Sequence, residues 1–211
     1  MATRYLDRLA RFAGCTSEVD WYLGSGNTYS YDTLGYLSAA GASAPDGTPI
    51  AAYSYTWDLD DRSMPIRSDW TDAIEGWYGH TTYDPNGRPL EIFGDYGSVS
   101  LTTELTHTYD SDGWLIASEQ HDEDRVISTT YNGCEDPILR LSDPDGGASI
   151  DETTIVWTYS SGCLPQTAVY SYNYRSSVYT EHFDAQGRTT HTVLSESGEP
   201  DQVSTWSWSC P

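Results

Sequence analysis

The stretch TTYDPNGRPLEI at residues 81–92 decides the fold, because close copies of it recur along the chain. The clearest copies are HTYDSDGWLIAS at 107–118 and EHFDAQGRTTHT at 181–192. The first four copies are spaced 26 residues apart, a period typical of repeat architectures. Eight units can be traced in all, each beginning at an anchor residue that is aromatic: Tyr31, Trp57, Tyr83, Tyr109, Tyr131, Tyr159, Phe183 and Trp208.

Each unit has the pattern of a β-hairpin. The Asp after the anchor can accept hydrogen bonds from backbone N–H groups just ahead of it, and the Gly three residues later can supply a positive φ. Before the anchor, rings alternate with Ser or Thr, so one sheet face should carry rings and the other hydroxyls. Two strands per unit predict an all-β fold, an antiparallel meander of repeated β-hairpins with up to about sixteen strands, forming a curved or rolled sheet.

The unit also resembles a known family. YDTLGYLS (31–38), YDPNGRPLEI (83–92), RLSDPDGG (140–147) and FDAQGRTTHT (183–192) are similar to the YD repeats of RHS-type proteins. The resemblance covers residues 21–211 and implies YD/RHS-like strands of a spiralling sheet, which in large family members wraps into a shell around a toxin or stalk. This chain has eight units and lacks the family's core-closing segment, so the resemblance implies the strand architecture and not encapsulation.

Four cysteines allow three disulfide pairings, and their spacing fits no zinc site. Cys134 and Cys163 follow their anchors by three and four residues, which places them at equivalent turns of adjacent units. We therefore expect Cys134 to pair with Cys163, and Cys15 with Cys210. Disulfides favour a secreted protein in an extracellular or periplasmic space, although no signal peptide is present in residues 1–14.

Two segments are expected. Residues 1–20 form an N-terminal segment that includes a short amphipathic helix with Tyr5, Leu6, Leu9 and Phe12 on one face. Residues 21–211 form a single β-hairpin repeat domain.

The charge restricts the partners. The net charge is -22, from 32 acidic side chains and 10 basic ones. A surface this acidic repels phosphate backbones and anionic lipids, so we expect no nucleic-acid partner. No stretch reaches the roughly 20 apolar residues of a membrane-spanning helix, so we expect no membrane insertion.

Aromatic side chains give the best indication of function. The chain has 17 Tyr and 8 Trp, and such rings either form the core of the sheet or line a groove that stacks on sugar rings. A glycan or another cell-surface polymer is the expected partner under the second interpretation. The candidate ligand-binding residues are Trp77, Tyr78, Trp114, Tyr170, Tyr172 and Tyr174.

Histidines and acidic turns are candidates for chemistry. His182 and His191 flank one hairpin turn and could face each other as catalytic or metal-binding residues, with ordinary packing as the alternative. Asp110 and Asp112 resemble the start of a calcium loop, but His121 stands where an EF-hand has its Glu, so a structural turn is preferred. No cofactor is expected apart from this calcium.

The sequence therefore predicts a secreted, non-catalytic repeat protein that binds an extracellular polymer such as a glycan. The alternative is an extracellular polysaccharide lyase or hydrolase that uses Tyr, His and carboxylate side chains in the concavity of the sheet. A structural piece of a larger toxin or adhesin is a third hypothesis.

Overall fold

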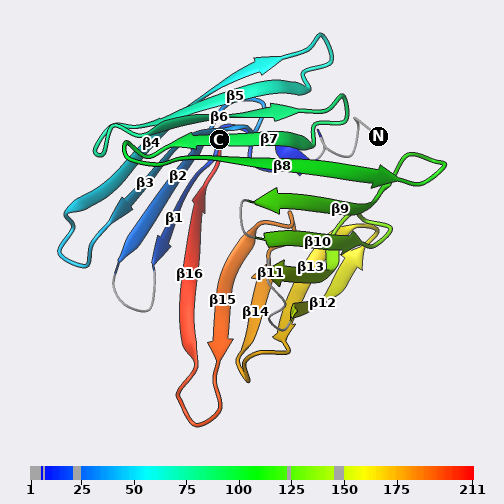
Figure 1. Cartoon of the computed structure of the whole chain (residues 1–211). Helices are drawn as coiled ribbons and strands as arrows, with labels where there is room; N and C mark the ends of the chain where they lie inside the picture. Colours follow the sequence, from blue (N-terminus) through cyan, green and yellow to red (C-terminus); the bar gives the residue numbers. More distant parts are fainter. Residues whose placement is uncertain (1–5, 7, 21–24, 123–124, 145–149) are drawn as a thin grey trace. The chain divides into compact units, whose positions relative to one another are not determined.

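The computed structural model describes residues 6, 8–20, 25–122, 125–144 and 150–211. Within them sixteen β-strands follow one another through short turns (Figure 1). They are β1 (Thr16–Asp20), β2 (Gly26–Tyr31), β3 (Leu37–Ser43), β4 (Pro49–Leu59), β5 (Pro65–Asp72), β6 (Tyr78–Tyr83), β7 (Pro89–Asp95), β8 (Ser100–Tyr109), β9 (Leu115–Asp122), β10 (Arg125–Tyr131), β11 (Pro137–Pro144), β12 (Asp151–Ser161), β13 (Leu164–Tyr172), β14 (Val178–Phe183), β15 (Thr189–Ser195) and β16 (Gln202–Ser209).

The predicted antiparallel meander of hairpins is confirmed. Strand order follows chain order, and β1 pairs with β16 as well as with β2, so the order closes on itself as expected for a rolled sheet. Residues 6 and 8–10 are helical, Tyr5 lies outside the described residues, and β1 begins within the N-terminal segment. No helix in the described part of the chain is long and apolar enough to cross a membrane.

The chain divides into two compact units. Unit 1 comprises Met1–Thr103 and Thr205–Pro211, and unit 2 comprises Glu104–Ser204. Strands β1 to β7 belong to unit 1 and β9 to β15 to unit 2, while β8 and β16 contribute to both.

The turns at Asp32, Asp84, Asp110 and Asp184 follow the Asp-x-x-Gly pattern. In the third repeat, Asp84 Oδ1 accepts hydrogen bonds from the backbone N–H groups of Asn86 at 2.8 Å and Arg88 at 2.9 Å, and Gly87 has a φ of 79°. One carboxylate therefore orders both sides of the turn. The residues whose side chains do the same are Asp32, Asp60, Asp84, Asp110, Asn132 and Asp184.

Two turns depart from the predicted pattern. In the second repeat the turn carboxylate is Asp60, not Asp58 of the Trp57-Asp58 pair, because β4 continues to Leu59 before the chain turns. The glycine position is taken there by Ser63, with a φ of 63°, and in the fifth repeat by Glu135, with a φ of 59°.

Between repeats, the Ala44–Thr48 turn closes around Asp46, whose carboxylate accepts from the Thr48 N–H at 2.9 Å. The predicted turn at residues 143–146 lies in part outside the described residues, because 145 and 146 are not among them.

A β-bulge accompanies the turn of every hairpin that joins two strands within a repeat. The pairing register shifts there, so that Tyr83 faces Pro89 and Tyr131 faces Pro137. Proline fits this position because a bulge removes a ladder hydrogen bond that it could not donate. The bulge also reverses which residues of the returning strand share a face with the anchor.

The pairing registers confirm two distinct sheet faces in each unit. The anchor face carries the aromatic anchors, and the hydroxyl face carries the Ser and Thr residues that precede them, such as Thr56, Thr108 and Thr158, which are exposed. On the anchor face of unit 1, Trp57 packs against Tyr36 at 4.7 Å and Tyr83 at 5.8 Å between ring centroids. Burial raises the pKa of Tyr83, as expected for a ring that serves as core.

The turns themselves are buried against one another. In unit 1, Tyr36 follows the first turn, is 1% exposed, and donates a hydrogen bond from its hydroxyl to the Ser63 carbonyl of the next turn at 2.7 Å. In unit 2, the buried Glu135 accepts from the Leu115 N–H at 3.0 Å, which links the fourth turn to the fifth. Consecutive repeats are therefore held together by contacts between their turns.

Both predicted disulfides are confirmed. Cys15 bonds Cys210 within unit 1, over a sequence separation of 195, and Cys134 bonds Cys163 within unit 2, over a separation of 29. Two disulfides indicate an oxidising environment.

Candidate ligand-binding site

Unit 2 contains a cavity on its anchor face, with a volume of about 590 Å³. Six consecutive strands, β8 to β13, and the residues just after β13 contribute to it. The residues around it are Leu105, Ser118, Gln120, Arg125, Ile127, Thr129, Tyr131, Pro137, Arg140, Ser142, Asp151, Thr153, Ile155, Tyr170, Tyr172 and Tyr174. We refer to this feature as the unit 2 cavity.

Strand register brings these side chains together in rows. Thr153 of β12 lies between Arg140 of β11 and Tyr172 of β13, and two pairs further along the strands Ile155 faces Tyr170. Side chains two residues apart share a face of a strand, so these two sets of paired residues lie on the same face and line the same side of the cavity.

The base of the cavity is apolar and firmly held. Ile127 is 3% exposed and Ile155 is 6% exposed. Beside them the hydroxyls of Ser118 and Tyr131 share a hydrogen bond at 2.9 Å. The cavity therefore has a buried apolar floor, with polar groups in its walls.

Tyr170 is tied to a carboxylate. Its hydroxyl donates to Glu181 Oε2 at 3.3 Å, and the Thr189 hydroxyl donates to Glu181 Oε1 at 2.6 Å. Burial of the ring and the nearby negative charge of Glu181 raise the pKa of Tyr170. Tyr170 therefore remains a protonated phenol at neutral pH.

Tyr172 and Tyr174 form an aromatic corner at one side of the cavity. Their rings meet edge to face, with centroids 5.6 Å apart. The Arg175 guanidinium lies 3.7 Å from the centre of the Tyr172 ring and 5.6 Å from that of Tyr174. Arg175 thus stacks on Tyr172 as a cation over an aromatic face.

The two arginines in the cavity wall differ in their partners. Arg125 pairs with Asp122, with 3.1 Å between Nε and Oδ2. Arg140 is exposed and forms no ion pair with any residue that the structure describes.

The three predicted tyrosines Tyr170, Tyr172 and Tyr174 thus lie in one cavity, whereas the other three ligand candidates lie elsewhere. Trp77, in unit 1, packs edge to face on Tyr96 at 5.4 Å between centroids. Tyr78, also in unit 1, is half exposed and donates from its hydroxyl to Asp95 at 3.2 Å.

Trp114 follows the fourth turn, and its backbone N–H donates to Asp110 at 2.8 Å. It is not one of the residues that line the unit 2 cavity.

His182 and His191 face each other directly across β14 and β15. Their rings stack in parallel, with centroids 4.1 Å apart. Burial, followed by the charge of His182, lowers the pKa of His191. Both side chains lie on the hydroxyl face, opposite the cavity, since His182 occupies the position that Thr158 has in the sixth repeat.

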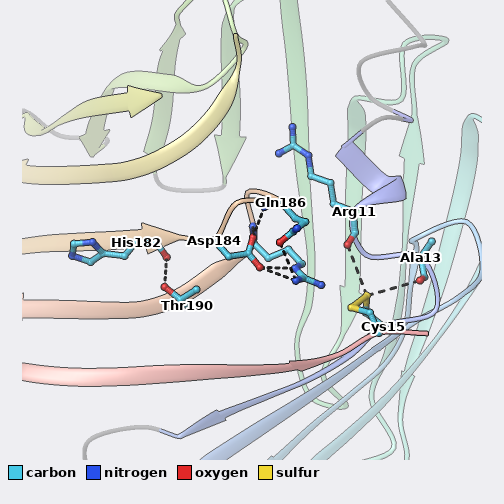
Figure 2. A network of polar contacts seen from close by, with 9 residues as sticks. Arg11, Ala13, Cys15, His182, Asp184, Gln186 and Thr190 are labelled. Atoms are coloured by element: carbon cyan, nitrogen blue, oxygen red, sulfur yellow. Dashed lines mark hydrogen bonds and ion pairs between the residues drawn. A yellow bond between two sulfur atoms is a disulfide. The ribbon is translucent and has the colours of Figure 1, made fainter. Parts of the chain in front are cut away.

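Figure 2 shows the His182 ring directed away from Asp184, while the His182 carbonyl accepts from the Thr190 hydroxyl at 3.2 Å. In the same view the Asp184 carboxylate is the centre of its turn, where it accepts from the Gln186 N–H at 2.8 Å.

The proposed calcium ligands act within their own turn. Asp110 Oδ1 accepts from the Asp112 N–H at 3.0 Å, and Asp112 itself is exposed. Within the described ranges, no group of three or more His, Cys, Asp and Glu residues could hold a metal ion.

Sequence reasoning missed Arg140, Tyr131 and Glu181 as neighbours of the three tyrosines. Tyr131 was treated as a structural anchor. Arg140 could have been found by counting strand alternation, but the bulge opposite Tyr131 reverses the alternation of β11.

Comparison with known proteins supports the fold. No protein-family description matches the sequence, and no curated protein matches it. Among solved structures, the chain is similar to a porin-like protein from Bacteroides uniformis ATCC 8492, with a TM-score of 0.59 and 12% identity, over 93% of this chain and 98% of that one. This likeness shows the fold and nothing of the ligand.

A second similar structure is the TcdB2-TccC3-Cdc42 complex, with a TM-score of 0.33 and 14% identity, over 86% of this chain and 12% of that one. This TM-score is too low to support a conclusion about the fold or function of this chain.

Proposed function

We propose that the protein binds glycans through the unit 2 cavity and is a non-catalytic repeat protein of an extracellular or periplasmic space. The observation that carries the proposal is the cavity itself, where Tyr170, Tyr172 and Tyr174 converge with polar side chains at a volume of about 590 Å³. This volume is in the range of small-molecule sites. Tyrosine rings stack on the apolar faces of sugars, and neighbouring hydroxyl and amide groups bond the sugar hydroxyls.

The composition of the wall supports a sugar over an apolar ligand. Thr129, Ser142 and Thr153 place hydroxyls along the same face, and Gln120 adds an amide. The two disulfides support a location outside the cytoplasm, in which such glycans occur.

A polysaccharide-degrading enzyme is the second candidate, favoured by the hydrogen bond between Tyr170 and Glu181 at the cavity wall. Two observations weigh against it. Burial and the charge of Glu181 raise the pKa of Tyr170, which disfavours the phenolate that a base would need, and His182 and His191 lie on the other face. Binding without turnover is therefore the function that the geometry supports best.

A glycan array followed by affinity measurement on each glycan that binds tests the proposal. Wild-type protein should bind at least one glycan class, and Tyr172→Ala should weaken that binding about fivefold or more, because a lost stacking ring costs on the order of 1–3 kcal/mol. Tyr78→Ala is the matched control, since Tyr78 is an exposed tyrosine of unit 1. Equal loss in both variants, or no glycan bound, would refute the proposed site.

An assay for new reducing ends and unsaturated products on the same glycans separates binding from catalysis. We expect none to form. Turnover that Tyr170→Phe abolishes would establish the enzyme instead.

A further inference from the structure

The arginines of this acidic chain differ in how their charges are compensated. Ion pairs with Asp are formed by Arg62 with Asp60, Arg67 with Asp69, Arg125 with Asp122, and Arg188 with Asp184. With a net charge of -22, a guanidinium without a carboxylate partner is unexpected. Among the described residues, Arg140 and Arg175 form no such pair.

Both of these arginines belong to the unit 2 cavity. Arg140 lines it, and Arg175 stacks on its Tyr172 ring at 3.7 Å. Two guanidinium groups without an ion pair to any described residue thus lie at or beside one cavity, although the chain has 32 acidic side chains.

The surroundings of Arg140 suit a bound anion. Its neighbours across the sheet are Thr129 and Thr153, whose short side chains carry hydroxyls and no charge. A guanidinium presents two parallel N–H groups that match the two oxygens of a carboxylate, and such paired bonds are among the strongest hydrogen bonds in proteins.

Two further charged residues line the wall, Arg125 and Asp151, and the charge of Arg125 is paired with Asp122. Asp151 faces Ser142, two pairs along the sheet from Arg140 and Thr153. A negatively charged ligand group is repelled at the Asp151 end of the wall and attracted at the Arg140 end. The tyrosine corner of Tyr172 and Tyr174 adjoins Thr153, and Arg175 covers one face of the Tyr172 ring. A sugar ring can stack on the tyrosine surface that Arg175 leaves open while its acidic group reaches Arg140.

We propose that the unit 2 cavity selects glycans that carry carboxylate groups, and that Arg140 is the residue that binds the carboxylate. This inference rests on the proposed glycan-binding function. Long-range repulsion by the acidic surface is screened over about 8 Å at physiological salt, whereas the contact with Arg140 is direct. The acidic surface also repels polyanions elsewhere on the protein. Binding of an acidic glycan is therefore expected at the cavity and not by non-specific adsorption.

The test compares uronate oligosaccharides with neutral counterparts of the same backbone. The probes are oligogalacturonate, hyaluronan oligosaccharides and alginate oligosaccharides, each also prepared with its carboxyl groups reduced to alcohols. Isothermal titration of the full chain should show, for at least one probe, binding at least tenfold tighter than to its reduced form. Arg140→Gln should reduce that preference to below about threefold and leave the affinity for the reduced form unchanged.

Arg62→Gln is the matched control, because Arg62 is an exposed arginine of unit 1, and it should keep the full preference. Near-ultraviolet circular dichroism of each variant verifies the fold.

The outcomes separate the two proposals. Equal affinity for acidic and reduced forms, or a preference that survives Arg140→Gln, overturns the carboxylate inference while glycan binding stands. If no probe binds but neutral glycans on the array do, the inference is again wrong and the proposed function is retained. If no glycan of either kind binds, both are refuted.

Discussion

A single side-chain oxygen orders six of the repeat turns by accepting two backbone hydrogen bonds at once. Asp84 does this with the N–H groups of Asn86 and Arg88, and in the fifth repeat Asn132 does the same through its amide oxygen, with the N–H groups of Cys134 and Asp136. The acceptor oxygen is therefore essential and the negative charge is not.

Substitution of the turn acceptor tests this. Asp84→Ala should lower the free energy of unfolding by about 1–3 kcal/mol, since two N–H groups lose their acceptor. Asp84→Asn should cost less than about half as much, because it reproduces the arrangement at Asn132. Urea denaturation of both variants makes the measurement, and equal losses would show that the charge is what matters.

The stacked histidines give stability a specific pH dependence. The pKa of His191 is lowered in the fold from its ordinary 6.5, by burial and then by His182, so the unfolded chain takes up a proton more readily. The contribution of neutral His191 is present above that ordinary pKa and is lost as the pH falls through the lowered value.

The urea concentration at the unfolding midpoint of the wild type should therefore decrease as the pH is lowered from about 7.5 to about 5. In His191→Gln this decrease should be smaller. The comparison is the slope of the midpoint against pH in the two proteins. An unchanged slope would mean that other groups set the pH dependence.

At the residue level the sequence predicted most of the turns. Asp32, Asp84, Asp110 and Asp184 are each followed by Gly at the third position, and a positive φ there is what glycine adopts at least cost. The hairpins after Trp57 and Tyr131 were also predicted, but not that Asp60 is the acceptor of the first turn or that Ser63 and Glu135 take the glycine positions at positive φ.

The strands themselves were predictable from the sequence. Which side chains lie on which face of each strand was predictable only in part. Alternation of rings and hydroxyls before the anchor predicted the two faces of β2, β4, β12 and β16. Each returning strand passes through a bulge that reverses this alternation, so the position of Arg140 on the cavity wall could not be derived from the repeat. Three of the six candidate ligand residues lie in the cavity, since Tyr170, Tyr172 and Tyr174 alternate along one strand and its end. The likeness to YD repeats stays a prediction.

Strands β5 and β6 show how rings and glycines fit together on the anchor face. The Trp70 ring passes over Gly79, where a Cβ would stand 2.6 Å from ring atoms and would also collide with the Phe93 carbonyl. Gly79→Ala should therefore destabilise the protein by about 1–3 kcal/mol, the usual cost of overpacking. Gly133→Ala is the control, because a Cβ there meets no atom within 4 Å and should change the unfolding midpoint little.

For the molecule as a whole, the two disulfides should contribute unequally to the free energy of unfolding. Cys15 and Cys210 close a loop over a sequence separation of 195, against 29 for Cys134 and Cys163. In the chain-entropy account, removing the first as Cys15→Ala with Cys210→Ala should cost about 5 kcal/mol, and removing the second about 3.5 kcal/mol. Equal losses in urea denaturation would argue against this account of their stabilisation.

The central claim is that the unit 2 cavity is the glycan site. A crystal structure of the protein with the oligosaccharide that binds most tightly tests it most directly. We expect a sugar ring against the Tyr172 and Tyr174 corner and its carboxylate within hydrogen-bonding distance of Arg140. A sugar bound on the hydroxyl face or in unit 1, with the cavity empty, would contradict the claim.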